Sequence, residues 1–285
     1  MKVRMPPLPR LPADDLPTPE VGSWAESKYD LIRYFSTLFT SSMKGKWGSL
    51  PYLDLFSGSG RARIRGTMSI LPSSASIALG LPQPFDRYVF CESEPDLMGA
   101  LQTRATRDFP SADCRFVPGD VNGAVDSILE KLPAPKPDFK VLTFCLADPC
   151  KLRDLHFDTI RRLSVRFMDF MVLIPSEMDA NRNIGVYLNP ENSIMSTFLG
   201  NAAWRDEWAR YADQDNAGAF VADQFGKQMA ALGYLYDGLE SAWLNRSTGK
   251  NLPLYHLMLF SRHPLGSKFW KEALEYTDPQ RDLGL

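Results

Sequence analysis

The segment Leu53-Asp54-Leu55-Phe56-Ser57-Gly58-Ser59-Gly60 places two closely spaced glycines just after a short apolar run that contains an acid. Such a run fits a buried strand of a parallel sheet. The glycines fit a turn tight enough to bring a ligand against backbone amides. The segment therefore predicts an α/β domain with a ligand site at the carboxyl end of an early strand.

Two phosphate-binding motifs match this segment poorly. A dinucleotide fingerprint has a small residue three positions after the second glycine, where this chain has Arg63. No segment supplies the Gly-x-x-x-x-Gly-Lys-Ser/Thr pattern of a P-loop. The segment instead resembles the first motif of class I S-adenosylmethionine-dependent methyltransferases, whose acid and Gly-x-Gly turn receive the amino-acid end of the cofactor. A glycine-rich connection without a ligand is the alternative interpretation.

Three later apolar runs also lead into an acid, at Glu92, Asp120 and Asp148. Ligands of open α/β sheets bind outside the carboxyl ends of the strands. Glu92 is predicted to bind ribose hydroxyls, with Glu94 as a neighbouring alternative, and Asp120 to contact the adenine edge. Each acid could instead cap a helix. The predicted cofactor-binding residues are Asp54, Phe56, Gly58, Gly60, Glu92, Asp120 and Val121.

The composition is that of a folded protein. With 285 residues, 44% of them hydrophobic and 23% charged, the chain can bury one substantial core, with or without a sizeable insertion. The net charge of −2 argues against a generally basic nucleic-acid binder but permits a local basic face. Arg61, Arg63 and Arg65 form such a cluster, as a phosphate contact or as a solvated helix or loop face.

Residues 1–20 form a proline-rich leader that we predict to be poorly ordered, and residues 21–285 a methyltransferase-like domain. Apolar spacing predicts helices at 24–43, 95–107, 122–131, 155–166 and 217–231, and strands at 168–174, 233–238 and 254–261. The polar stretch at about 176–215 fits neither a strand nor an ordinary crossover and is predicted to be a substrate-facing lid.

The four cysteines lack metal-ligand spacing, which predicts reduced thiols and no metal. There is no signal-peptide pattern and no run long enough to span a membrane. We therefore expect a cytoplasmic protein.

Several segments together resemble the three-Cys-motif partner proteins (TcmP): Val21-Gly22-Ser23-Trp24, Met43-Lys44-Gly45, Tyr52 to Arg61, Ala180-Asn181-Arg182-Asn183 and Ser261-Arg262-His263-Pro264-Leu265-Gly266. The resemblance implies a Rossmann-like class I methyltransferase sandwich, a mostly parallel seven-stranded sheet flanked by helices. It also implies a bacterial or phage origin and a cysteine-motif partner protein. In such proteins the residue after Asp-Pro is commonly aromatic, whereas here it is Cys150.

Asp148 and His263 are the candidate catalytic residues. The Asp148 carboxylate could accept a hydrogen bond from an acceptor N–H, and His263 could act as a base or bind substrate. Asp148 could instead orient the turn or touch the cofactor, and His263 could instead stabilise a turn. Asn181 and Arg182 could contact an anionic or nucleotide substrate, or stabilise a loop.

Cys150 supports a different chemistry, and we include it among the candidate substrate-site residues. Pro-Cys after the fourth strand resembles cytosine-C5 DNA methyltransferases, whose cysteine attacks the base. The chain lacks that family's Glu-Asn-Val and Gln-x-Arg-x-Arg motifs. The missing aromatic residue also removes a stacking platform for a flipped adenine.

Together these features predict an S-adenosylmethionine-dependent methyltransferase with a nucleic acid or nucleotide-like acceptor. A non-catalytic cofactor-binding subunit that organises a cysteine-motif protein is the alternative, because fold does not decide between the two. A non-methyl reaction of the same cofactor is a third possibility.

Overall fold

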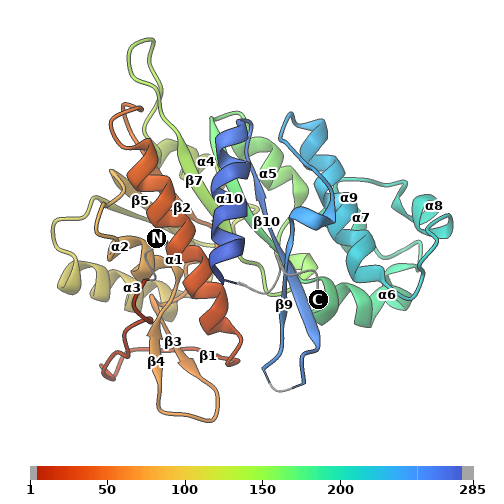
Figure 1. Cartoon of the computed structure of the whole chain (residues 1–285), viewed down its shortest axis with the longest axis horizontal. Coiled ribbons are helices and arrows are strands. Elements are labelled where there is room, and N and C mark those ends of the chain that lie inside the picture. Colours follow the sequence, from red (N-terminus) through yellow and green to blue (C-terminus); the bar gives the residue numbers. More distant parts are fainter. Residues whose placement is uncertain (1–4, 249, 278–285) are drawn as a thin grey trace. The chain divides into compact units, whose positions relative to one another are not determined.

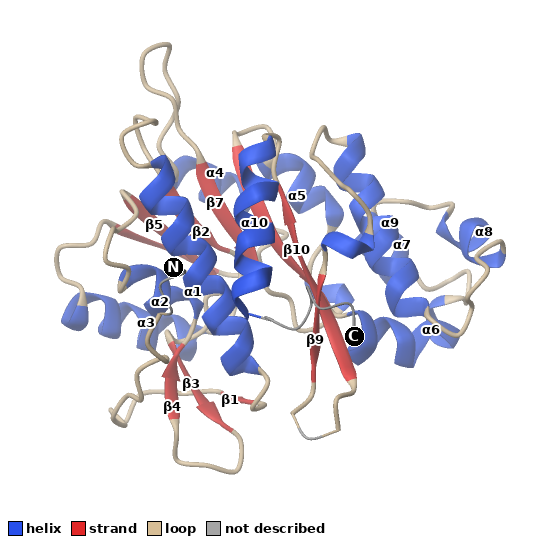
Figure 2. Cartoon of the chain, viewed as in Figure 1, coloured by secondary structure: helices blue, strands red, loops and turns tan. Residues whose placement is uncertain are grey.

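The strands of the main sheet run in the order β6-β5-β2-β7-β8-β10-β9 (Figures 1 and 2). The computed structural model describes residues 5–248 and 250–277. Residues 1–4 of the predicted leader and 278–285 of the predicted domain lie outside them. Strands β6, β5, β2 and β7 pair in parallel, whereas β10 is antiparallel to both β8 and β9. The predicted fold class, a mostly parallel seven-stranded α/β sheet flanked by helices, is confirmed.

The elements follow one another through the chain as strands and helices. The strands are β1 (Glu20–Val21), β2 (Pro51–Asp54), β3 (Arg61–Ile64), β4 (Ile70–Pro72), β5 (Arg87–Glu92), β6 (Cys114–Pro118), β7 (Thr143–Ala147), β8 (Met168–Ile174), β9 (Trp243–Arg246) and β10 (Pro253–Phe260). The α-helices are α1 (Ala25–Met43), α2 (Ser74–Leu79), α3 (Pro95–Asp108), α4 (Val125–Lys131), α5 (Phe157–Leu163), α6 (Asn181–Tyr187), α7 (Ile194–Leu199), α8 (Trp204–Ala209), α9 (Ala217–Ala231) and α10 (Pro264–Thr277). Short helical turns are η1 (Leu152–Asp154), η2 (Ser176–Ala180) and η3 (Leu239–Ser241).

The chain divides into two compact units. The first comprises the described residues up to Leu146 and those from Lys268 onward, and the second is Ala147–Ser267. The described residues of the predicted leader belong to the first unit.

An aromatic cluster forms the core of the first unit. The apolar face of α1 places Phe35 and Phe39 on Phe144 of β7, with ring centroids 5.2 and 5.5 Å apart. Trp270 of α10 packs edge-on against Phe35, in agreement with the adjacent positions of α1 and α10 in Figure 1. Burying such rings is among the largest favourable terms in folding, so this cluster anchors α1 over β2 and β7.

A hairpin of β3 and β4 separates the glycine turn from the next helix. It forms a small sheet in the order β1-β3-β4. The predicted basic helix or loop face at 61–65 is therefore mostly a strand, in which the Arg61 side chain is buried. The Ser73 N–H donates to the Gly60 carbonyl at 2.9 Å and returns the chain to the glycine turn before α2 begins.

The described part of the leader is packed against the first unit, so its prediction as a poorly ordered tail was wrong. Leu8 is 3% exposed, and the Leu11 N–H donates to the Ile70 carbonyl at 2.9 Å. The Pro19 carbonyl likewise accepts a hydrogen bond from the Arg63 N–H of β3 at 2.9 Å. Prolines remove donors and restrict φ, but they do not prevent an extended chain from lying on a strand edge.

One other prediction differs from the structure in the second unit. The strand expected at 233–238 is absent, because Gly233 and Gly238 have φ of +85° and +93° and interrupt an extended chain. Strand β9 takes its place beside β10. The predicted lid at 176–215 consists mainly of short helical segments, η2, α6, α7 and α8.

Candidate functional site

The strand order of the main sheet reverses beside β2. From β2 the chain adds β5 and then β6 on one side, and later β7 on the other. Such a reversal is the topological switch point at which open α/β sheets bind ligands, outside the carboxyl ends of the strands. Asp54, at the end of β2, pairs with Phe90 of β5 and Leu146 of β7. The glycine turn that follows Asp54 therefore lies at the switch point.

Gly58 and Gly60 give this turn its shape. Both adopt left-handed backbone conformations, with φ of +59° and +82°. A Cβ added at Gly58 would meet nothing within 4 Å, whereas one at Gly60 would lie 2.9 Å from Ser76 Oγ and 3.1 Å from Leu101 Cδ1. Gly58 thus leaves room beside its backbone for a ligand, and Gly60 permits close packing on α2 and α3.

The Glu92 carboxylate faces the glycine turn from the end of β5. Its Oε2 accepts a hydrogen bond from the Gly58 N–H at 2.7 Å, and its Oε1 accepts one from the Glu94 N–H at 2.9 Å. The Ser93 hydroxyl also donates to Oε1 at 3.4 Å. A carboxylate has about four lone-pair sites, so Glu92 keeps capacity for a further hydroxyl donor. Glu94 is exposed at the N-cap of α3. Of the two neighbouring acids, Glu92 is the one that contacts the glycine turn.

Asp54 is fully buried and stabilises the turn through hydrogen bonds. Its carboxylate accepts hydrogen bonds from the Tyr52 hydroxyl at 3.1 Å and the Phe56 N–H at 3.2 Å. The Ser57 N–H and hydroxyl both donate to the Cys91 carbonyl at 3.0 Å. These bonds connect the turn to β5. They show how Asp54 organises the site, while its direct contact with a cofactor stays a prediction.

The end of β6 joins the same edge. The Gly119 N–H donates to the Glu92 carbonyl at 2.9 Å. The next residue, Asp120, is exposed and its carboxylate accepts the Asn122 N–H at 2.8 Å, whereas Val121 is buried. The structure therefore brings all seven predicted cofactor-binding residues to the ends of three adjacent strands.

The predicted substrate and catalytic residues lie in the second unit. Asp148 is half-buried directly after β7, and Cys150 is exposed two residues later. The main chain just beyond them is held by Asp179, whose Oδ2 accepts the Leu152 N–H at 2.8 Å. The sequence did not mark Asp179.

Asp179 is the centre of a hydrogen-bond cluster. Its Oδ1 accepts bonds from Asn183 Nδ2 at 2.7 Å and the Tyr187 hydroxyl at 2.5 Å. Burial is the main reason why the pKa of the Tyr187 hydroxyl is raised, and its hydrogen bond to Asp179 raises it further. Only the i, i+4 spacing of Asp179 and Asn183 could have signalled this cluster in the sequence.

Asn181 joins two segments of the chain. Its Nδ2 donates to Glu177 at 2.8 Å and its Oδ1 accepts the Ala217 N–H at 3.0 Å, where α9 begins. This arrangement favours the loop-stabilising alternative over a substrate contact for Asn181. Arg182, in contrast, is exposed.

His263 lies at the edge where β8 begins, because antiparallel pairing places Phe260 opposite Phe170. Its Nδ1 accepts the Leu265 N–H at 3.2 Å at the start of α10. Within this unit the residues that follow β8 lie at the other end of the β8–β10 pair. The geometry favours the turn-stabilising role of His263 over that of a base.

His256 is the histidine at that other end, paired with Ile174 at the end of β8. The sequence marks it only as an ordinary strand residue. Its Nδ1 lies 2.8 Å from the Ser176 hydroxyl, and its side chain is buried. Burial lowers the pKa of His256 from 6.5 to about 4, because charging the ring in this environment is costly.

The strand cysteines are poorly suited to nucleophilic chemistry. Burial raises the pKa of Cys91 to about 12 and that of Cys114 to about 11, and raises that of Cys145 as well. Over residues 5–248 and 250–277, no three His, Cys, Asp or Glu side chains gather as a metal site. Within the same ranges, no helix has the length and apolar character to cross a membrane.

No protein-family model matches the sequence, and no curated protein matches it. Among solved structures, a Legionella pneumophila protein described as family DUF519 is 14% identical, with a TM-score of 0.45, over 88% of this chain and 93% of that one. Magnesium protoporphyrin IX methyltransferase from Synechocystis, solved with SAH, is 8% identical over 84% and 86% of the chains, with a TM-score of 0.45. The O-methyltransferase TomG from Streptomyces achromogenes, solved with SAM, is 14% identical over 83% and 80%, with a TM-score of 0.43.

The two glycines of the turn should differ in their sensitivity to alanine. Gly58→Ala is expected to lower the free energy of unfolding by about 1–2 kcal/mol, the cost of a left-handed backbone at a non-glycine residue. Gly60→Ala is expected to cost a further ~1–3 kcal/mol, because the added Cβ must displace Ser76 and Leu101. Urea unfolding measures both values. Equal losses would contradict this packing.

His256 should make stability depend on pH. The unfolded chain binds a proton near pH 6.5 that the folded state takes up only near pH 4. Stability is therefore full above pH 6.5 and falls as the pH drops toward 4, by about 3 kcal/mol at most. His256→Asn, which keeps a polar group near Ser176, should remove this dependence.

The measurement is the difference in unfolding free energy between wild type and His256→Asn from pH 4 to 7. The difference is needed because Asp169 contributes a pH dependence of the opposite sign. Burial raises its pKa to about 7, so its contribution to stability is lost as the pH rises toward 7. Both proteins keep Asp169, and the difference cancels its effect. A difference that stays constant with pH would refute the buried neutral histidine.

Proposed function

We propose that this protein binds S-adenosylmethionine at the glycine turn and transfers its methyl group to a nucleic acid or nucleotide-like acceptor. One observation carries the proposal: the Gly58 amide and the Glu92 carboxylate meet at 2.7 Å at the topological switch point of the sheet. Open space beside Gly58 and the lone pairs that remain on Glu92 suit the two polar ends of an amino-acid nucleoside.

The residues at the carboxyl ends of β2, β5 and β6 would each contact a different part of S-adenosylmethionine. The turn held by Asp54 would receive the amino-acid end, beside the open face of Gly58. Glu92 would bind the ribose hydroxyls. Asp120, exposed beside the buried Val121, would contact the adenine. The cofactor would supply a methyl group on a sulfonium, so the protein would chiefly need to position and orient the reactants.

A dinucleotide fits the same fold less well. The doubly wound dinucleotide fold has the order 3-2-1-4-5-6 and binds pyrophosphate at the helix that follows the glycines. In this chain the glycines lead into strand β3, and antiparallel β10 is inserted between β8 and β9. Both features favour S-adenosylmethionine over a dinucleotide.

Asp148 is the residue we propose to face the acceptor. It follows β7, and a half-buried carboxylate there could accept a hydrogen bond from an acceptor N–H. We further propose a cysteine-motif protein as partner, on the sequence resemblance to the TcmP family. If that partner completes the site, the isolated chain would bind cofactor without transferring methyl groups.

Replacing Glu92 tests the cofactor. Glu92→Gln keeps the shape of the side chain but removes its charge, so we expect binding of S-adenosylmethionine to weaken roughly tenfold. Glu94→Gln is the matched control, because Glu94 is exposed two residues away, and it should bind as wild type does. Calorimetric titration with S-adenosylmethionine and S-adenosylhomocysteine measures the affinities, with NAD and ATP as ligand controls. Equal affinities for the two variants would contradict the assignment.

Replacing Asp148 and Cys150 separates two acceptor chemistries. In a methyl-transfer screen with labelled cofactor over DNA, RNA and the partner, Asp148→Asn is expected to lower the rate roughly 100-fold. Cys150→Ser should retain most of the rate, since its thiol is not proposed to attack the base. Loss of activity in Cys150→Ser with Asp148→Asn unaffected would instead support cytosine-C5 chemistry.

A further inference from the structure

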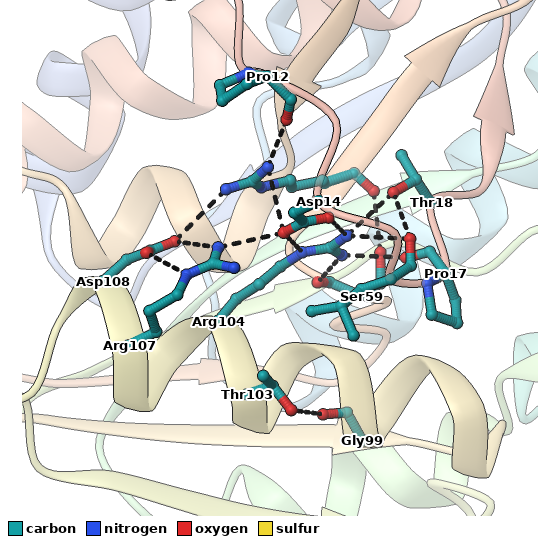
Figure 3. A network of polar contacts seen from close by, with 12 residues as sticks. Pro12, Asp14, Pro17, Thr18, Ser59, Gly99, Thr103, Arg104, Arg107 and Asp108 are labelled. Carbon is teal, nitrogen blue, oxygen red and sulfur yellow. Dashed lines mark hydrogen bonds and ion pairs between the residues drawn. The ribbon is translucent and has the colours of Figure 1, made fainter.

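The leader is joined to the glycine turn through one buried arginine (Figure 3). Arg104, on α3, is 1% exposed. Its Nη1 donates to the Ser59 carbonyl at 2.7 Å and to the Pro17 carbonyl at 3.0 Å. One guanidinium group therefore connects the middle residue of the Gly-x-Gly turn to the main chain of the leader.

The opposite side of the same guanidinium is held by Asp14. Arg104 Nε and Nη2 donate to the two Asp14 oxygens at 3.0 and 2.7 Å, the paired geometry that gives arginine–carboxylate contacts their strength. Nη2 also donates to the Thr18 hydroxyl at 3.0 Å and the Leu16 carbonyl at 3.2 Å. These leader groups accept hydrogen bonds from the N–H donors of Arg104 that do not bond to Ser59.

Asp14 is shared with two further arginines. Arg61 approaches it at 3.2 Å from β3, and Arg107 at 3.1 Å from the next turn of α3. Hydrogen bonding to Arg104 is the main reason why the pKa of Asp14 lies well below its usual value. Arg61 Nη1 also donates to the Pro12 carbonyl at 2.7 Å, so the leader is held on both sides of this carboxylate.

The glycine turn depends on this arrangement. The Ser59 carbonyl accepts from Arg104, and the Ser59 hydroxyl donates to the Arg61 carbonyl at 3.0 Å. The Arg104 side chain also lies against the Cα of Gly60, where an added Cβ would be 3.9 Å from its Cδ. A buried arginine deprived of its carboxylate would seek other acceptors or water, and Ser59 is bonded to that same group.

We infer that Asp14 and Arg104 are positioning residues for the glycine turn, so that residues 12–18 belong to the cofactor site as a fixed strap. The inference rests on the proposed function for its consequence in cofactor binding. Neither residue needs to touch the cofactor. Asp14 orients Arg104, and Arg104 fixes the Ser59 carbonyl, which shares one planar peptide unit with the Gly60 N–H.

The test compares two neighbouring acids. Asp14→Asn keeps the shape of the side chain but removes the charge that holds Arg104. Asp15→Asn makes the same change one residue away, at an exposed side chain with φ of +57°, a conformation that asparagine tolerates. Hydrogen–deuterium exchange followed by mass spectrometry measures amide protection in the peptide covering the turn. Calorimetry measures S-adenosylmethionine affinity.

For Asp14→Asn we expect at least tenfold faster exchange of the turn amides and roughly tenfold weaker cofactor binding. Peptides from β8 and β10 should exchange as in wild type, which separates a local effect from general unfolding. Asp15→Asn should match wild type in both measurements. If Asp14→Asn does not fold, Arg107→Gln replaces it, because Arg107 is 44% exposed and bonds the same carboxylate. An increase in exchange of about fivefold is then expected.

Unchanged exchange in the turn would overturn the inference. So would faster exchange with unchanged cofactor affinity, because the strap would then have no bearing on the site. Failure of the wild type to bind S-adenosylmethionine would remove the proposed function. In that case faster exchange in Asp14→Asn would still support the positioning of the turn.

Discussion

The parallel pairing of β2 between β5 and β7 is the constraint on which the rest of the first unit depends. It sets Asp54 opposite Phe90 and Leu146, so that the three strands end at one edge. A shift of one residue would move the aromatic side chains of these buried strands to the opposite face of the sheet. The register that satisfies the core is therefore the one that brings Glu92 to the Gly58 amide.

The leader adds a second constraint of a different physical kind. A buried guanidinium is costly to remove from water, and Arg104 is stable only because leader and turn together satisfy it. Hydrophobic packing would hold the strap in many orientations, whereas paired hydrogen bonds to Asp14 select one. A proline-rich segment, whose composition is often typical of poorly ordered chain, thus becomes part of the surroundings of the candidate site.

In the second unit, the direction of one strand decides which histidine lies near which edge. Because β10 runs antiparallel to β8, His256 lies beside the end of β8 and His263 beside its beginning. The two histidines are seven residues apart in the sequence, which gives no sign of this separation. Asp179 similarly acquires its role only when η2 lies against the first residue of η1.

The sequence by itself determined the α/β class, the glycine turn and the acids that follow the strands. Apolar runs, turn residues and helical spacing are local signals, which is why the strand at 168–174 and the helix at 217–231 agree with β8 and α9. Gly233 and Gly238 are visible in the sequence, but their positive φ, which interrupts the expected strand, is not. Only the tertiary structure decided that Glu92 and not Glu94 faces the turn, that His263 lies at the far edge of its strand, and that the leader is fixed. Each of those depends on hydrogen bonds or strand pairings between residues distant in the sequence, as between Asp14 and Arg104, and no local pattern records such a contact.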